Sequence, residues 1–216
     1  SDGALLPLGG AMALLTRIVC LLLCPLFALA GVQSFSVSGG KEWNRVVFHS
    51  EAVLESFEGV NTRISGELSL DPDQLGAPVH ADFLVDVKGF DTGISLRNQH
   101  MLSNHLHAER FPTSQLRLVS LLPTHGGALV ENQPQRLSAE VDFTLHGVTR
   151  RIDVPVVVTR VPDGSQTPCR HPGAVLHVQA EFPVALADYG IPRPEFLFLK
   201  VGEQVTITLD CWASSN

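Results

Sequence analysis

Apolar and polar residues alternate over most of the chain, which is the period of a β-strand with one buried and one solvent-facing side. Strands are expected over 45–54, 63–70, 79–88, 114–122, 136–145, 149–161, 174–186 and 201–213. About eight short strands without a strand–helix–strand rhythm predict an all-β barrel or sandwich. A closed barrel of about eight strands has an interior that is filled by side chains or holds one small ligand.

One segment, residues 91–112, breaks the alternation and predicts a helix between two strands. Asp91 or Thr92 is placed to cap its first turn, and Pro112 is placed to end it. On an ideal helix one apolar face would carry Ile94, Met101, Leu102 and Leu106, with Asn98 and His105 among them. The opposite side would carry Arg97, His100 and His107. We therefore expect a helical insertion that caps one end of the barrel with its apolar side.

The apolar sides of the strands form either a packed core or a ligand cavity. Pattern alone favours a packed core, because every barrel must fill its interior. Small inner residues leave room for a ligand, and a tryptophan at Ala139 or Ala180 would then fill that room. The residues expected at the cavity and its mouth are Phe48, Phe83, Val85, Ile94, Arg97, Met101, Leu102, Ala139, Val141, Phe143, Ala180, Phe182, Phe196 and Phe198.

Two parts of that set, the phenylalanines of the run 196–199 and Arg97, can each be interpreted in two ways. The four consecutive apolar residues 196–199 cannot all face inward in a strand. They either fix the last crossover to the barrel or form one lip of the entrance. Arg97 either binds a phosphate or quinone oxygen at the mouth, or it pairs with Asp91 or Glu109, and the pairing is favoured.

The beginning of the chain predicts a secretory signal peptide. Met12 is followed by Arg17, by the apolar run 18–30 and by a small-x-small pattern that ends at Ala30. The apolar run of about 13 residues is short of the roughly 20 that span a bilayer. We expect residues 1–30 to be upstream sequence and signal peptide, residues 31–216 to form a single domain, and the mature protein to be periplasmic.

Cleavage after Ala30 would leave Cys169 and Cys211 as the remaining cysteines. An exported protein can keep a disulfide, but Cys211 falls on the expected inner face of the last strand and Cys169 in a loop. The sequence leaves this pairing open.

Charge and spacing exclude several classes of function. The net charge is −7 and no basic run occurs, which argues against nucleic acid and anionic lipid surfaces as partners. His100, His105 and His107 lack the spacing of helical zinc sites, and no nucleophile motif is present. We expect no metal, no other cofactor and no catalysis.

Several short motifs resemble the YceI-like family of bacterial secreted lipid-binding proteins. They are Asp91-Thr92-Gly93, Arg97-Asn98-x-His100 and Arg110-Phe111-Pro112, with 48–52, 57–59, 64–66, 70–72, 145–149 and 189–191 in the same order. The resemblance covers roughly residues 46–213. It implies a lipocalin-like antiparallel barrel that holds a long amphipathic isoprenoid.

Together these observations predict an exported carrier or storage protein for an isoprenoid or isoprenoid quinone, with a link to stress and transient contact with a membrane or membrane protein. The alternative is a non-catalytic interaction module with a packed barrel core. The sequence does not specify the oligomeric state.

Overall fold

The computed structural model describes residues 31–51, 56–75, 78–123, 127–192, 195–196, 199–200 and 202–216. The expected signal peptide lies outside these ranges. The strands are β1 (Gln33–Val37), β2 (Arg45–Ser50), β3 (Phe57–Asn61), β4 (Ile64–Leu70), β5 (His80–Asp86), β6 (Thr113–Pro123), β7 (Pro134–Leu145), β8 (Val148–Val161), β9 (Val175–Ala185), β10 (Glu195–Phe196), β11 (Leu199–Lys200) and β12 (Gln204–Ser215). The helical elements are η1 (Val87–Gly89), α1 (Ser95–His100), η2 (Met101–His105), η3 (Gly164–Gln166) and η4 (Leu186–Tyr189).

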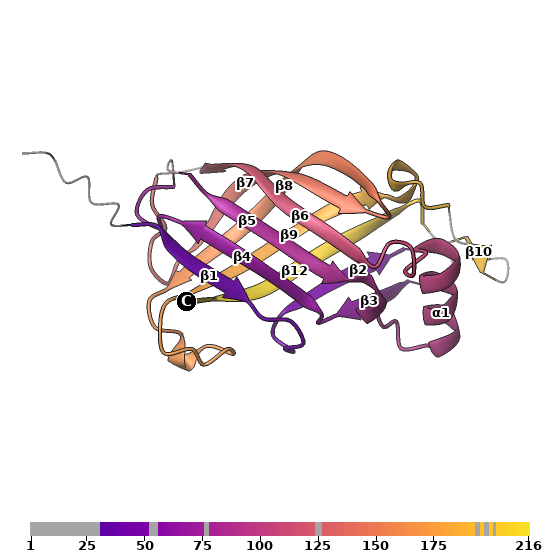
Figure 1. Ribbon diagram of the computed structural model, residues 1–216, viewed down its shortest axis with the longest axis horizontal. Helices are drawn as coiled ribbons and strands as arrows, with labels where there is room; N and C mark the ends of the chain where they lie inside the picture. The colour runs from indigo at the N-terminus through magenta and orange to yellow at the C-terminus, as the bar shows by residue number, and fades with distance from the viewer. Residues whose placement is uncertain are drawn as a thin grey trace, which may run out of the picture.

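The strands close into an antiparallel barrel (Figure 1). One edge of β12 pairs with β9, and its other edge pairs first with β2 and then, near Ser214, with β1. β1 and β2 therefore lie end to end along β12, and β4 and β3 lie end to end beside them. If β1 with β2 is counted as one interrupted strand, and β4 with β3 as another, the barrel has eight strands, as predicted.

A buried asparagine holds each interruption. Asn44 donates to the Ser38 carbonyl at 3.1 Å and accepts from the Trp212 amide at 2.7 Å. Asn61 donates to the Asp86 carbonyl at 2.8 Å and accepts from the Arg63 amide at 2.8 Å. These side chains replace the ladder bonds that the breaks remove, because buried backbone groups must be paired.

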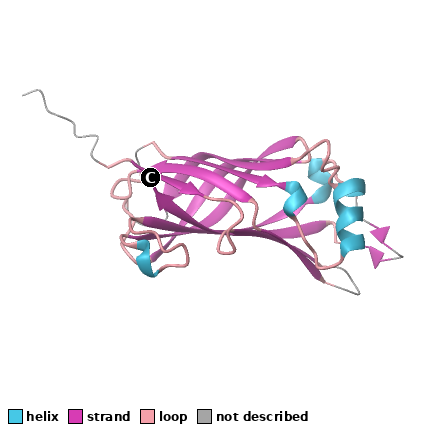
Figure 2. Ribbon diagram, turned by 60° about the horizontal axis from the view of Figure 1, so that its bottom comes forward, coloured by secondary structure: helices cyan, strands magenta, loops and turns pink. Residues whose placement is uncertain are grey.

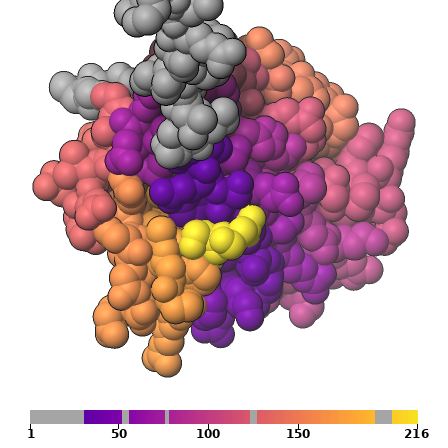
Figure 3. Space-filling model, turned by 60° about the vertical axis from the view of Figure 1, so that its left-hand side comes forward, coloured from indigo at the N-terminus to yellow at the C-terminus, as the bar shows by residue number. Residues whose placement is uncertain are grey.

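The barrel is packed at the end that carries β1 and the C-terminus. Figure 3 looks onto this end, where β1 (indigo), the loop over 163–173 (orange) and the last residues (yellow) lie against one another. Its interior is filled by alternating residues of several strands, among them β1, β4, β7, β8, β9 and β12, as the period of two requires. The buried residues include Phe35, Leu68, Leu137, Ala139, Val141, Val154, Leu176, Val178, Ala180, Cys211 and Ala213.

Cys211 belongs to this packed end, and both Cys169 and Cys211 are free thiols. Burial raises the pKa of the Cys211 thiol to about 12, and the neighbouring Asp210 adds to the shift. We expect Cys211 in the native protein to resist alkylation by iodoacetamide near pH 8, because the thiolate is the reactive form. Mass spectrometry should find both cysteines alkylated after denaturation without reductant. A cysteine that reacts only after reduction would establish the disulfide instead.

The segment 91–112, called the lid below, covers the other end of the barrel (Figures 1 and 2). It is less helical than expected. α1 begins at Ser95 after Ile94, which makes no capping bond with its side chain. The predicted caps Asp91 and Thr92 lie in the preceding turn. Among the described residues, no helix is long and apolar enough to cross a bilayer.

The lid helix also ends earlier than predicted. After α1 the chain makes a π-helical turn, in which the Leu106 amide donates to the Met101 carbonyl at 2.9 Å. His107 then adopts a left-handed conformation with φ 44°. The helix therefore stops well before Pro112, and the π-turn rotates every later side chain relative to an ideal α-helix.

Candidate ligand-binding cavity

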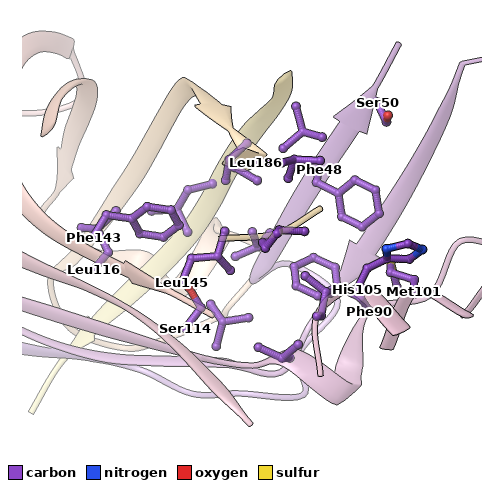
Figure 4. A pocket seen from close by; sticks show the side chains of 18 of the residues that line it. Phe48, Ser50, Phe90, Met101, His105, Ser114, Leu116, Phe143, Leu145 and Leu186 are labelled. Carbon is purple, nitrogen blue, oxygen red and sulfur yellow. The ribbon is translucent and has the colours of Figure 1, made fainter. Parts of the chain in front are cut away.

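Under the lid, the barrel interior is not filled. A cavity of about 200 Å³ lies there, whereas a single buried water needs only about 10–15 Å³ on the same measure. Figure 4 shows side chains from opposite walls of the barrel and from the lid pointing into it. The lining residues are Val46, Phe48, Ser50, Phe57, Ile64, Phe83, Val85, Val87, Phe90, Arg97, His100, Met101, His105, Leu106, Ser114, Gln115, Leu116, Phe143, Leu145, Phe182, Leu186, Ile191, Val205, Ile207 and Leu209.

The structure brings half of the expected site residues to this cavity. They are Phe48, Phe83, Val85, Arg97, Met101, Phe143 and Phe182. The strand residues among them face inward by simple alternation, and they lie in the half of the barrel nearer the lid. Their part in binding a ligand stays a prediction.

The remaining expected residues lie elsewhere or outside the described side chains. Ala139, Val141 and Ala180 are buried in the packed end. Their small size lets neighbouring side chains pack closely and leaves no space for a ligand. A tryptophan at Ala139 or Ala180 would therefore overpack the core and would not fill a ligand cavity, contrary to the expectation. Phe198 lies outside the described residues, as does the side chain of Phe196 on β10, a strand near α1 (Figure 1).

Two predicted lid positions also miss the cavity. Ile94 is 50% exposed, and Leu102 lines a separate hollow with His107 and Phe111. The prediction assumed one continuous α-helix. Met101, His105 and Leu106 line the cavity, as the ideal helix places them, and they are joined there by Arg97 and His100, which the ideal helix places on the opposite side.

Sequence reasoning missed several lining residues that a simple signal could have found. Ser50 continues the inward alternation of Val46 and Phe48 along β2. Ile207 sits between Val205 and Leu209 on the inner face of β12 in the same way. His105 falls on the apolar face of the predicted lid helix and does line the cavity, but a polar histidine on that face is not among the expected site residues.

The aromatic wall of the cavity is assembled from β2, β3 and the end of η1. The Phe48 ring packs edge-on against Phe57 at 6.0 Å and tilted against Phe90 at 5.4 Å between ring centroids. Gly59 makes room for it, since a Cβ there would overlap Phe48 Cε1. The Phe-Glu-Gly motif therefore positions an aromatic ring over a strand glycine.

Three further motif segments meet where the lid contacts the barrel rim. His146, in the turn between β7 and β8, has Nδ1 at 3.0 Å from the Tyr189 carbonyl, so this nitrogen must donate. His146 Nε2 lies 2.8 Å from His107 Nδ1, within hydrogen-bond distance. The Phe111 ring also packs against His146, with 4.4 Å between centroids. These contacts fix the end of the lid to the barrel.

The other end of the lid is held by polar contacts around Asp91. Its carboxylate accepts from Asn98 Nδ2 at 2.7 Å and from the Gly93 amide at 2.8 Å. The hydrogen bond from the Asn98 side chain has the largest effect, and the one from the Gly93 amide the next largest, in holding the pKa of Asp91 below its usual value. Asp91 also bridges to β3 through paired backbone bonds with Val60. The lid therefore begins on β3, beside the cavity wall.

Arg97 lies at the cavity edge, and its described contacts differ from the predicted pairing. Its guanidinium donates to the Thr92 hydroxyl at 3.0 Å and the Thr92 carbonyl at 2.9 Å. It also lies 4.4 Å above the centre of the Phe57 ring, within cation–π range. Glu109, the other predicted partner, pairs with Lys88 at 2.8 Å. Arg97 thus connects the lid to the aromatic wall.

His105 gives the cavity a pH-dependent element. Burial is the main reason that its pKa is lowered from 6.5, and the charges of His100 and His107 add to the shift. As the pH falls below 6.5, the unfolded chain takes up a proton that the folded protein does not, so stability decreases until the lower folded pKa is reached. Urea unfolding at about pH 7 and about pH 5 should show a smaller acid-induced loss for His105→Leu than for the wild type. Equal losses would show that His105 titrates normally.

Solved structures share this architecture at low sequence identity. BcnA from Burkholderia cenocepacia has a TM-score of 0.62 and 18% identity, with 79% of this chain and 96% of that chain covered. A polyisoprenoid-binding domain from Saccharophagus degradans, implicated in plant cell wall breakdown, has a TM-score of 0.63 and 14% identity, covering 85% and 99%. The YCEI protein of Campylobacter jejuni has a TM-score of 0.55 and 10% identity, covering 73% and 84%. At these identities the likeness establishes the fold.

The sequence itself establishes the family. No curated protein sequence matches the chain. The model of the YceI-like domain matches residues 41–213, which include every strand from β2 to β9 and nearly all of β12. The resemblance seen in the motifs is thereby confirmed, and the chain belongs to the YceI-like family.

Proposed function

We propose that this protein binds one long-chain amphipathic lipid, an isoprenoid or an isoprenoid quinone, inside its barrel and carries or stores it without changing it chemically. The observation that carries the proposal is the unfilled apolar cavity of about 200 Å³ beneath the lid. Membership of the YceI-like family supports it, as does the fold shared with the polyisoprenoid-binding domain of Saccharophagus degradans.

The cavity wall suits an apolar chain. Phenylalanine, leucine, isoleucine and valine side chains provide most of the lining. Burial of a hydrocarbon against such a wall contributes roughly 25 cal/mol per Å² removed from water. The unfilled apolar cavity also argues against the alternative, an interaction module, because that alternative requires a packed barrel interior.

The lid is the route by which a lipid would enter and leave. Its ends are attached to β3 through Asp91 and to the barrel rim through His107 and His146. The middle contributes Met101 and Leu106 to the cavity wall, and Leu106 also packs against the hydrophobic core. A bound chain would complete the packing of these side chains.

The signal peptide expected over residues 12–30 supports a periplasmic location, where transient contact with a membrane or a membrane protein would deliver and collect the lipid. N-terminal sequencing of exported protein should give a start near Gly31. Membrane-bound protein that retains Met12 would contradict this part of the proposal.

Titration with a long-chain lipid tests the binding itself. Protein freed of endogenous lipid should bind fluorescent polyprenol saturably, with one molecule per chain. Added protein partners should not be required. Failure of the wild-type protein to bind any long-chain lipid would refute the proposed function and favour the interaction module.

A further inference from the structure

Among the described residues that line the cavity, two polar atoms are buried without a hydrogen-bond partner. They are the hydroxyl oxygen of Ser50 and Nδ1 of His105. Ser50 is 0% exposed. Leaving a buried polar group unpaired costs about 1–3 kcal/mol, so such groups are rare and call for an explanation.

The other polar residues of the lining all have partners. Ser114 Oγ donates to the Thr144 carbonyl at 2.7 Å, and Gln115 Nε2 donates to the Asp82 carboxylate at 2.7 Å. Arg97 is bound to Thr92, and His100 Nδ1 lies 3.3 Å from Asn104 Nδ2. Ser50 and His105 are therefore exceptional within one wall whose other polar groups are satisfied.

Both residues lie at the lid end of the cavity. Ser50 is the last residue of β2 and stands opposite Val205 on β12 and Phe57 on β3. His105 ends the π-helical turn of the lid. In Figure 4 both lie toward the same side of the pocket, near Phe48 and Met101, while Phe143 and Leu116 lie at the other side. The polar atoms are thus at the mouth, and the far side is apolar.

We propose that Ser50 Oγ and His105 Nδ1 bind an uncharged, oxygen-bearing head group of the ligand, such as a hydroxyl or a carbonyl. This inference rests on the proposed function and specifies its ligand. The apolar chain then extends from the mouth toward Phe143 and Phe182. Binding would give these two polar atoms the hydrogen-bond partner that no described residue provides.

The chemistry of the two residues favours a neutral head group over a phosphate. A serine hydroxyl both donates and accepts, and a neutral imidazole nitrogen does one or the other. Burial, with the charges of His100 and His107, lowers the pKa of His105. His105 is therefore neutral near pH 7 and brings no positive charge to the site. A buried phosphate would need charged donors to offset its desolvation.

The test compares three probes on protein freed of endogenous lipid: geranylgeraniol, the matching hydrocarbon without the hydroxyl, and geranylgeranyl diphosphate. The wild type should bind the alcohol about tenfold more tightly than the hydrocarbon, which corresponds to about 1.4 kcal/mol. The double variant Ser50→Ala/His105→Leu should lose this preference and keep its affinity for the hydrocarbon.

Ser114→Ala provides a matched control, since it removes a hydroxyl from the same wall, but one that is already hydrogen-bonded to Thr144. It should lower the melting temperature and leave the ratio of alcohol to hydrocarbon affinity at the wild-type value. Ser50→Ala should not lower the melting temperature of the lipid-free protein, because the hydroxyl it removes has no partner.

The outcomes separate the two proposals. Equal affinity of the wild type for alcohol and hydrocarbon, or much tighter binding of the diphosphate, would overturn the head-group assignment and leave lipid binding intact. A preference for alcohol that survives in the double variant, or is lost equally in Ser114→Ala, would also overturn it. Failure of all three probes to bind would refute the proposed function, and the head-group assignment with it.

Discussion

Phe143→Ala is expected to lower the free energy of unfolding by about 3–5 kcal/mol. The Phe143 ring is 6% exposed. It packs edge-on against Phe182 at 5.5 Å and against Tyr189 at 5.4 Å between centroids. These contacts connect β7 to β9 and to η4 at the boundary between the packed end and the cavity. Alanine would remove them and add empty volume to an existing cavity, which the rigid barrel cannot collapse to fill.

Equilibrium urea unfolding of lipid-free protein measures this loss. Phe143→Leu is the control, because it keeps most of the apolar volume and should cost less than about 1.5 kcal/mol. A loss below about 1 kcal/mol for Phe143→Ala would mean that the ring is not packed as described.

Ile207→Trp is expected to abolish lipid binding while the protein remains folded. Ile207 lies on the inner face of β12, opposite Phe48 on β2 and Phe182 on β9. It is only partly buried although it faces inward, because it borders the cavity. A tryptophan there would occupy volume that the lipid otherwise takes, so the change in stability of the lipid-free protein should be below about 1 kcal/mol.

Ala180→Trp is the matched control for that experiment. Ala180 also faces inward, on β9, but it is 6% exposed within the packed end. The same large side chain should cost about 1–3 kcal/mol or more there, through overpacking. Thermal melting and lipid content of both variants would be measured together. Severe destabilisation by Ile207→Trp, or normal lipid content in it, would show that the space beneath the lid does not hold the ligand.

The barrel could be predicted from the sequence because strand alternation is local. A period of two along β7, for example, places Leu137, Ala139, Val141 and Phe143 inward without any knowledge of their neighbours. The same rule cannot say which inward residues border a cavity. Ala139 and Phe143 share a face of one strand, yet one lies in the packed end and the other at the cavity wall.

The lid was harder to predict, because its geometry depends on non-local contacts. The helical segment was found, but the π-turn over Met101–His105 changes which residues face inward. His107 ends it in a left-handed conformation that is supported by His146, distant in the sequence. No periodicity in the lid encodes that contact, so an ideal helix places Ile94 and Leu102 in the cavity, where the structure does not have them. The same periodicity correctly turns His105 inward.

Mass spectrometry of organic extracts from the purified protein tests the central claim most directly. Wild-type protein and Ile207→Trp, expressed and purified side by side, would be extracted, and the lipid in each extract would be quantified per mole of protein. The account predicts close to one long-chain amphipathic lipid per wild-type chain and only background in the variant. Wild-type extracts without any long-chain lipid, or equal amounts in both extracts, would contradict it.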